Sequence, residues 1–298
     1  MAWARRTAVT PWTEGYRPMN DQAPINKIIP FSNVDGPGNR TSIFFQGCTY
    51  ACKFCHNPET IRLCIHCGAC VPGCPTGALR RENGLVRWNA TDCVQCDACL
   101  KACPHMSSPR IRWMRAEEVF HEIRRAFPYI EGITVSGGDC TLYAAFLKEL
   151  FPLVRAFGKT CLIDGNGAYD FTRDPELLEV CDGVMLDIKA ADPEWSRFLI
   201  GNDGACALRS LDSLLRAGKL AEVRTVIFPG RDHENEETVR TVAQRIQNAC
   251  PYKIIRYRPF GVRTEFQALL GEDTTEFEEA ERYASLARSL GATKAFVV

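Results

Sequence analysis

Short apolar runs alternate with amphipathic segments along most of the chain. The runs are only a few residues long and rich in β-branched residues, which is typical of buried strands, whereas the segments between them carry apolar residues at helical spacing. Residues 116–127, for example, place Val119, Phe120, Ile123 and Phe127 on one face of a helix. The pattern predicts helices at 116–127, 141–156, 207–218, 234–249 and 274–290, and strands at Thr41–Gln46, Ile133–Val135, Cys161–Asp164, Val184–Ile188, Val223–Ile227 and Lys253–Tyr257.

This alternation predicts an α/β fold with a parallel sheet and right-handed connections. Six strand–helix units suit a partial (β/α)6 barrel, in which reactive side chains gather at the carboxyl ends of the strands. A cysteine-rich segment interrupts the alternation, so we expect an N-terminal lead with the first strand and a cysteine loop (1–59), an insert (60–107) and the rest of the barrel (108–298). Prolines in residues 1–24 predict an irregular lead.

Composition narrows the possible partners. The chain has 36 Lys and Arg against 36 Asp and Glu, so no overall basic field favours nucleic acid, and the arginines of 110–125 are typical of a solvated face. No apolar run approaches the roughly 20 residues that span a bilayer. Arg5 and Arg6 are not followed by the apolar segment of a signal peptide. We therefore expect no nucleic acid and no membrane as partner, and a cytoplasmic location.

The sixteen cysteines are concentrated in one part of the chain, because eleven of them lie between Cys48 and Cys103. A disulfide framework does not bunch in this way in so long a chain, and the cytoplasm keeps thiols reduced. Metal or cluster ligation is therefore the simpler interpretation. The five scattered cysteines are expected to be small buried hydrophobic residues.

Cys48, Cys52 and Cys55 form a C-x3-C-x2-C run directly after the first predicted strand. Three thiolates at this spacing can hold three corners of a [4Fe–4S] cube, and the fourth iron then has no protein ligand. An iron with a free position binds a substrate or cofactor, whereas a cluster with four thiolates only transfers electrons. The run also differs from the paired C-x2-C ligands of zinc. It therefore predicts a cluster that takes part in chemistry.

The insert contains two copies of the bacterial ferredoxin run C-x2-C-x2-C-x3-C-P. In two-cluster ferredoxins the fourth cysteine of each run binds the other cluster. The repeat thus predicts two further [4Fe–4S] clusters; zinc, the alternative, does not require this rhythm. The expected ligands are Cys64, Cys67, Cys70 and Cys103 for one cluster, and Cys93, Cys96, Cys99 and Cys74 for the other.

Three motifs around the first cysteine run resemble the opening of the radical S-adenosylmethionine (SAM) activases of glycyl radical enzymes, of which pyruvate formate-lyase activase is the familiar member. With its insert, the chain is similar to the larger activases of the glycerol dehydratase and hydroxyphenylacetate decarboxylase type, and it looks closest to the YjjW branch. The resemblance runs from about residue 25 to the C-terminus and is densest before residue 110. The motifs are Val34-Asp35-Gly36-Pro37-Gly38-Asn39-Arg40, Phe44-Phe45-Gln46-Gly47-Cys48 and Cys52-x-Phe54-Cys55-His56-Asn57-Pro58.

The resemblance implies that Cys48, Cys52 and Cys55 hold the catalytic cluster, whose free iron takes the amino and carboxylate groups of SAM. One electron then cleaves SAM, and the 5′-deoxyadenosyl radical removes a hydrogen from a backbone glycine of a partner glycyl radical enzyme. The cofactor carries this chemistry, and the protein positions it. The insert clusters would relay electrons from a flavodoxin or ferredoxin, and Asp35 would face the partner's glycine loop. An anaerobic cytoplasm is the expected setting.

The resemblance also implies contacts with the cofactor. It implies that Asp139, where the family usually has Glu, contacts the amino group of the methionine part of SAM. It also implies that Lys189 contacts the methionine carboxylate. Asp164 and Asp187, with the carbonyl of Met185, correspond to a monovalent cation site. The expected cofactor contacts are Phe54, His56, Asn57, Gly137, Gly138, Asp139, Asp164, Asp187, Lys189, Arg224 and Arg258, the last about where the family often has a histidine.

Plainer interpretations stay open at several of these positions. Asp139 fits a simple strand-to-helix turn, Asp187 and Lys189 fit a structural ion pair, and Asp35 fits an Asx turn. For the whole chain, the alternatives are a radical SAM enzyme acting on another peptide or a small molecule, and a ferredoxin-like electron carrier without catalysis. The long segment after Cys103 is superfluous for a carrier.

Overall fold

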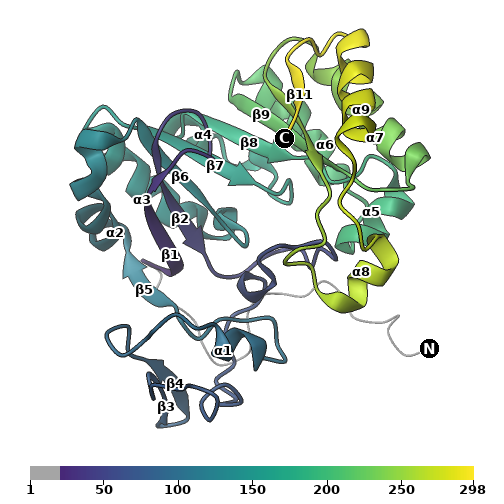
Figure 1. The fold of residues 1–298 in the computed structure, drawn as a ribbon. Helices are drawn as coiled ribbons and strands as arrows, with labels where there is room; N and C mark the ends of the chain where they lie inside the picture. Colours follow the sequence, from purple (N-terminus) through teal and green to yellow (C-terminus); the bar gives the residue numbers. More distant parts are fainter. Residues whose placement is uncertain (1–20) are drawn as a thin grey trace.

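The computed structural model describes residues 21–298, which form a curved sheet with helices on its outer face and a small unit attached at one end (Figure 1). The sheet has nine strands in the order β11-β10-β9-β8-β7-β6-β2-β1-β5. The six strands predicted from the sequence are confirmed to within a few residues, and they pair in parallel. They are β2 (Arg40–Phe45), β6 (Gly132–Gly137), β7 (Thr160–Gly165), β8 (Gly183–Asp187), β9 (Leu220–Ile227) and β10 (Tyr252–Arg256).

Three strands towards the edges of the sheet were not predicted from the sequence pattern. β1 (Gln22–Ser32) pairs antiparallel with β2 and with β5 (Arg112–Arg115), and β11 (Ala295–Val297) pairs parallel with β10. The prediction of an irregular lead is therefore wrong for residues 22–24, and residues 1–20 lie outside the described part of the chain. Pro24 fits into β1 because its carbonyl still accepts a hydrogen bond, from the backbone N–H of Gln46 at 2.9 Å.

Most of the helices cover the outer face of the sheet (Figure 1). α4 (Pro175–Val180) and α5 (Pro193–Ile200) add to the predicted set; each begins at an Asp-Pro pair whose aspartate caps the helix, as Asp192 does by accepting from the backbone N–H of Trp195 at 2.5 Å. No helix in residues 21–298 is long and apolar enough to cross a membrane. The predicted helices are confirmed as α2 (Ala116–Ile123), α3 (Ala144–Arg155), α6 (Ala205–Arg216), α7 (Asp232–Ile246) and α9 (Phe277–Ser289), and α8 (Thr264–Leu270) is additional.

The two faces of the central strands differ in polarity, and this difference places the site. Outward-facing residues such as Ile43, Ile133 and Val184 join the main hydrophobic core beneath the helices. Inward-facing residues alternate with them, because successive side chains of a strand point to opposite faces. The inward set is largely polar and includes Ser42, Thr134, Ser136, Asp164, Asp187, Glu222, Arg224 and Lys253.

The cysteine-rich insert folds as a small unit at one end of the barrel (Figure 1). It contains an antiparallel hairpin of β3 (Leu79–Glu82) and β4 (Leu85–Trp88) and the short helix α1 (Ala98–Lys101). A bridge between Arg62 and Ser107 brings its two ends together. Its own core is small and is built on Cys70, Leu79, Val86 and Cys99.

Candidate active site

A cavity of about 1010 Å³, part of it open to solvent, lies at the carboxyl ends of the central strands. This is the end at which barrels of parallel strands gather reactive side chains. The loop after β2 and the ends of β6, β7, β8 and β9 all contribute to it. The predicted site residues that line the cavity are Cys48, Cys52, Phe54, Cys55, His56, Asn57, Gly137, Gly138, Asp164, Asp187, Lys189 and Arg224.

Backbone hydrogen bonds hold the loop that carries the three cysteines. The N–H of Cys48 donates to the carbonyl of Ile61, and the N–H of Lys53 donates to the carbonyl of Leu199, both at 2.9 Å. Nδ2 of Asn166, which follows β7, donates to Sγ of Cys48 at 3.5 Å. The loop is thus fixed by the start of the insert on one side and by the barrel on the other.

Burial determines the chemistry of these thiols. It raises the pKa of Cys48 well above the usual value and raises the pKa of Cys52 to about 11. The free thiols therefore keep their protons at neutral pH, and a bound metal is the group that would displace them. Among the described residues, Cys48, Cys52 and Cys55 are the cysteines that line this cavity. A three-thiol donor set fits a [4Fe–4S] cluster with one open iron.

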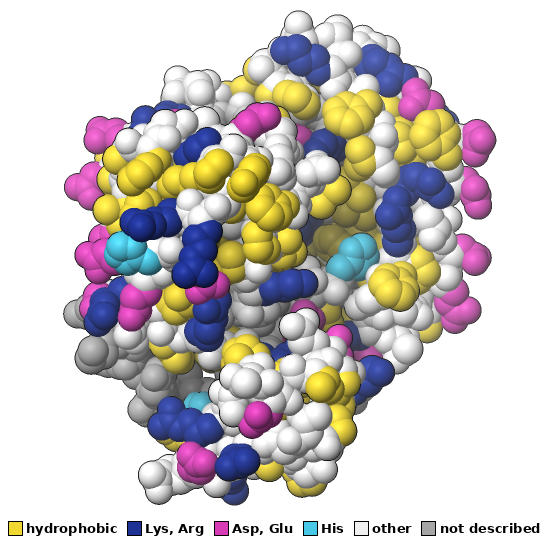
Figure 2. Space-filling view, turned by 60° about the vertical axis from the view of Figure 1, so that its left-hand side comes forward, with side chains coloured by type: hydrophobic (Ala, Val, Ile, Leu, Met, Phe, Trp, Pro, Cys, Tyr) yellow, Lys and Arg dark blue, Asp and Glu magenta, His cyan; other side chains and the backbone are white. Residues whose placement is uncertain are grey.

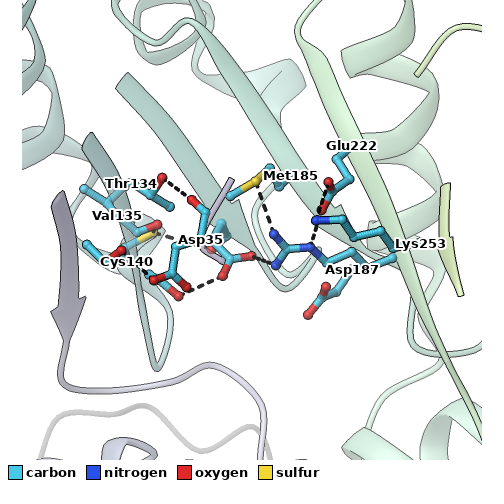
Figure 3. A network of polar contacts seen from close by, with 12 residues as sticks. Asp35, Thr134, Val135, Cys140, Met185, Asp187, Glu222 and Lys253 are labelled. Atoms are coloured by element: carbon cyan, nitrogen blue, oxygen red, sulfur yellow. Dashed lines mark hydrogen bonds and ion pairs between the residues drawn. The ribbon is translucent and has the colours of Figure 1, made fainter. Parts of the chain in front are cut away.

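A chain of charged groups crosses the inner face of the sheet (Figure 3). Arg224 donates from Nη1 to Asp164 at 2.9 Å and from Nε to Glu222 at 2.5 Å, and Glu222 also pairs with Lys253 at 2.8 Å. Oγ of Ser136 donates to the other oxygen of Asp164 at 2.9 Å. Burial raises the pKa of Asp164 although Arg224 acts in the opposite direction. Two carboxylates and two cations therefore balance beside the cavity.

Asp187 and Lys189 form a second ion pair at the end of β8, with Nζ of Lys189 2.9 Å from the Asp187 carboxylate. The ammonium also lies 5.3 Å from the ring centroid of Phe54, which is within cation–π range. Burial lowers the pKa of Lys189, but the carboxylate of Asp187 reverses the effect and the net shift is upwards. Lys189 is therefore a permanent cation in the cavity wall, where it can meet an anionic group of a ligand.

The structure does not bring Asp139 to the cavity. Its buried carboxylate accepts from the hydroxyl of Thr49 at 2.6 Å and from the backbone N–H of Thr141 at 3.1 Å, and so caps the short helix 140–143. Both oxygens are used within the protein. In this structure the contacts of Asp139 are those of a strand-to-helix turn, and they do not support the predicted role with the amino group.

Asp35 and Arg258 also lie off the cavity. Arg258 is exposed and contributes its backbone carbonyl, 3.0 Å from Nε2 of His56. The carboxylate of Asp35 accepts from the hydroxyls of Ser32 and Ser42, each at 2.6 Å, and not from the backbone of an Asx turn. Asp35 therefore sits at the amino ends of the strands, inside the barrel.

Sequence reasoning missed Glu222 and gave no separate role to Ser136 or Asn166. The signal for Glu222 is its position two residues before Arg224 on one strand, which puts both side chains on the inner face. Ser136 and Asn166 stand in the strand-end motifs themselves. Their contacts depend on which strands are neighbours, which the sequence does not state.

The insert holds two smaller cavities, each of about 310 Å³, part of which is open to solvent. Each is lined by three cysteines of one ferredoxin run and the last cysteine of the other, as crossed ligation requires. The thiols are Cys64, Cys67, Cys70 and Cys103 in one cavity and Cys74, Cys93, Cys96 and Cys99 in the other.

Each insert cavity also has one buried polar atom without a hydrogen-bond partner in the described residues. These atoms are Nε1 of Trp88 in the cavity of Cys74 and Oγ of Ser107 in the cavity of Cys64. Buried donors normally have a partner. The sulfurs of an iron–sulfur cluster accept hydrogen bonds, so both cavities fit such a group.

Comparison with known proteins adds the family. The model of the radical SAM superfamily matches residues 42–245. A Haemophilus influenzae protein with the provisional description glycyl-radical enzyme activating enzyme is 30% identical over 300 aligned positions, which cover 92% of this chain and 96% of that protein. The chain belongs to the radical SAM family of glycyl-radical enzyme activating enzymes.

Other relatives of this radical SAM protein agree. The benzylsuccinate synthase activating enzyme of Thauera aromatica is 32% identical over 230 positions, 69% of each chain. The solved structure of Streptococcus suis SuiB bound to the precursor peptide SuiA has a TM-score of 0.50 and 11% identity over 63% of this chain and 43% of that one, which concerns the fold alone. The family implies a [4Fe–4S] cluster and SAM as cofactors.

Proposed function

We propose that this protein cleaves SAM reductively and removes a hydrogen from a backbone glycine of a partner glycyl radical enzyme. The observation that carries the proposal is a three-cysteine loop at a large cavity whose wall contains buried cations and carboxylates. A [4Fe–4S] cluster and SAM bound there would supply a 5′-deoxyadenosyl radical. The similarity to an activating enzyme over nearly the whole chain supports the same conclusion.

The protein's own part is to bind and orient. Lys189 and Arg224 offer cations for the carboxylate of SAM, and Asp164 and Asp187 offer acceptors for its ammonium group. We give the acceptor role to these two aspartates because both line the cavity, whereas Asp139 does not.

A monovalent cation is a further part of the proposal. Carboxylate oxygens of Asp164 and Asp187 and the carbonyl of Met185 would suit a hard cation. Arg224 now neutralises Asp164, and its Nη2 lies 3.2 Å from Sδ of Met185. Lys189 pairs with Asp187 in the same way, so a cation would have to compete with both side chains for these carboxylates. SAM affinity measured with and without potassium tests for it.

The partner's glycine loop would approach the turn that carries Asp35. Val34 in this turn is 79% exposed, and Phe31 and Tyr129 are exposed with ring centroids 6.2 Å apart. Figure 2 shows hydrophobic side chains gathered on the side of the molecule that carries α2 and β1. The rim lies at the amino ends of the strands, so the loop would have to pass Asp35, whose carbonyl accepts from the hydroxyl of Thr134 at 2.6 Å, to reach the cavity at the carboxyl ends.

The insert would carry two further [4Fe–4S] clusters and pass electrons from a flavodoxin or ferredoxin to the catalytic cluster. Each insert cavity has one exposed thiol, Cys67 in one and Cys96 in the other, so each has an edge that a donor can approach. An open iron is sensitive to oxygen, and we therefore place the activity in an anaerobic cytoplasm.

The test is anaerobic reconstitution, reduction with dithionite, addition of SAM and measurement of 5′-deoxyadenosine. Wild-type protein is expected to form 5′-deoxyadenosine, whereas the Cys52→Ala variant is not expected to form it. Cys250→Ala is the matched control, because Cys250 is equally buried but lies in the main core. Absence of 5′-deoxyadenosine from wild type with three clusters bound would refute the proposal in favour of an electron carrier.

The partner is tested separately, because another radical SAM enzyme would also cleave SAM. A glycyl radical protein encoded near this one should acquire a glycyl radical signal in electron paramagnetic resonance (EPR). Cleavage of SAM with no glycyl radical in such a partner would instead favour another peptide or a small molecule as substrate.

A further inference from the structure

The two insert cavities differ in their charged linings. We call the cavity of Cys74, Cys93, Cys96 and Cys99 the Arg110 cavity, because Arg110 and Trp88 line it. The Ser107 cavity, formed by Cys64, Cys67, Cys70 and Cys103, has neither Lys nor Arg nor Trp in its wall, and its other polar side chains are His105 and Ser107. Two clusters with the same thiolate ligands would therefore meet different surroundings.

Arg110 is fixed in the wall of its cavity. It pairs with Asp97 at 2.6 Å, but its side chain is 18% exposed whereas that of Asp97 is 54% exposed. Water therefore screens the carboxylate more than the guanidinium. Asp97 lines the cavity as well, but its carboxylate is the more screened of the two charges, so the guanidinium acts more strongly on a group in the cavity. Nε1 of Trp88, buried without a partner in the described residues, adds an N–H donor.

We infer that Arg110 and Trp88 raise the reduction potential of the cluster in the Arg110 cavity above that of the cluster in the Ser107 cavity. The inference rests on the proposed function, which supplies the clusters and a flavodoxin or ferredoxin as reductant. One electron leaves the donor and makes the cluster more negative by one charge. A nearby cation and an N–H donor to sulfur stabilise the reduced cluster, because charge and hydrogen bonds to the sulfurs set the potential.

This inference gives the insert a direction for electron uptake. The cluster in the Arg110 cavity takes the first electron and the cluster in the Ser107 cavity takes the second. Arg110 and Trp88 do not line the active-site cavity, so their role is to tune a relay cluster and not to catalyse.

The experiment is a redox titration of the full-length, anaerobically reconstituted protein, followed by EPR. Cys67→Ser and Cys96→Ser assign the two insert signals, since each changes one exposed ligand of one cavity. Arg110→Gln is expected to lower the midpoint of the cluster that Cys96→Ser identifies. Its reduced-to-oxidised ratio at the wild-type midpoint should fall about threefold to tenfold, and tenfold corresponds to about 59 mV for one electron.

Three further variants make the result specific. Trp88→Phe should shift the same cluster in the same direction by less, and Arg110→Lys should keep most of the wild-type midpoint because it keeps the charge. Arg112→Gln is the matched control, since Arg112 lies two residues away, pairs with Glu122 and lines neither cavity. It should move neither midpoint.

An unchanged midpoint in Arg110→Gln with full iron content would overturn the inference, as would an equal shift of both insert clusters. If Arg110→Gln loses iron, Trp88→Phe decides the question by the same criterion. Failure of the proposed function looks different: wild type would then show both insert signals but form no 5′-deoxyadenosine. Wild type that forms 5′-deoxyadenosine while the Ser107 cavity is reduced first would overturn only the present inference.

Discussion

Replacing Arg40 with methionine should loosen the barrel at the turn before β2. Arg40 is 2% exposed, and its partners are neutral oxygens. Nε donates to Oγ1 of Thr134 at 2.9 Å, Nη2 donates to the carbonyls of Ile133 and Thr160 at 2.7 and 3.1 Å, and Nη1 donates to the carbonyl of Pro37 at 3.4 Å. The guanidinium therefore ties the turn to β6 and β7. Methionine keeps the apolar length of the side chain and removes every one of these bonds.

The expected cost follows from the bonds. A hydrogen bond from a charged donor contributes about 1.5–3 kcal/mol, so the three bonds of 3.1 Å or less give about 4.5 kcal/mol at the lower value. Part of this loss is offset because the substitution also removes a buried cation. Burial lowers the pKa of Arg40, which shows that its positive charge is costly there. We expect a net loss of about 3 kcal/mol, which is roughly a hundredfold change in an opening equilibrium.

Hydrogen exchange of the native, cluster-loaded protein measures this loss without unfolding it. Amides in β2 and β6 should exchange about a hundredfold faster in Arg40→Met than in wild type. Arg240→Met on α7 is the control, because Arg240 pairs with Glu236 at the exposed surface and such pairs contribute little. An acceleration below about threefold in β2 and β6 would refute the reasoning that neutral acceptors repay the burial of this cation.

Three other outcomes follow from the site and the insert. Gly138→Ala should lower the iron bound by the cysteine loop, because a Cβ there would lie 2.2 Å from the carbonyl of Gly47. Gly158→Ala, whose Cβ would meet nothing within 4 Å and whose φ of +69° confines the strain to its own turn, should leave the iron content unchanged. Asp139→Asn should keep the Kd for SAM within about threefold by calorimetry, since Asp139 does not line the cavity, and a loss above about tenfold would return the amino-group role to it. Removal of iron by a chelator should expose 64–103 to protease while 132–297 stays protected, because the insert core is small; equal cleavage of both parts would contradict this.

The central strands could be predicted because they are short and their outward-facing residues are apolar. In the structure, helices cover these apolar faces. β1 could not, because Pro24 and its mixed polarity read as irregular until β2 and β5 supply partners on both sides. An aspartate directly before a proline marks the start of both α4 and α5. Both helices are too short for the spacing of their apolar residues to predict them.

The cysteines and the strand-end charges could be predicted to gather because parallel strands present their carboxyl ends at one edge. The direction of a single short side chain could not. Asp139 stands two residues before Thr141, and an aspartate in that position can accept from the backbone N–H two residues on. That local bond competes with any bond to a ligand, and in this structure it holds the carboxylate in its own turn.

The insert and the catalytic loop share one set of backbone contacts, which affects how the relay can be tested. The N–H of Cys48 bonds to the carbonyl of Ile61, and the N–H of Arg62 bonds to the carbonyl of Met106 at 3.1 Å, beside the bridge from Arg62 to Ser107. Both ends of the insert therefore support the loop that carries the first catalytic cysteine. Deleting the insert would remove this support together with the relay, so a loss of activity would not say which had failed. A single change such as Arg110→Gln leaves these backbone contacts in place, and it can therefore separate the transfer of electrons from the positioning of the loop.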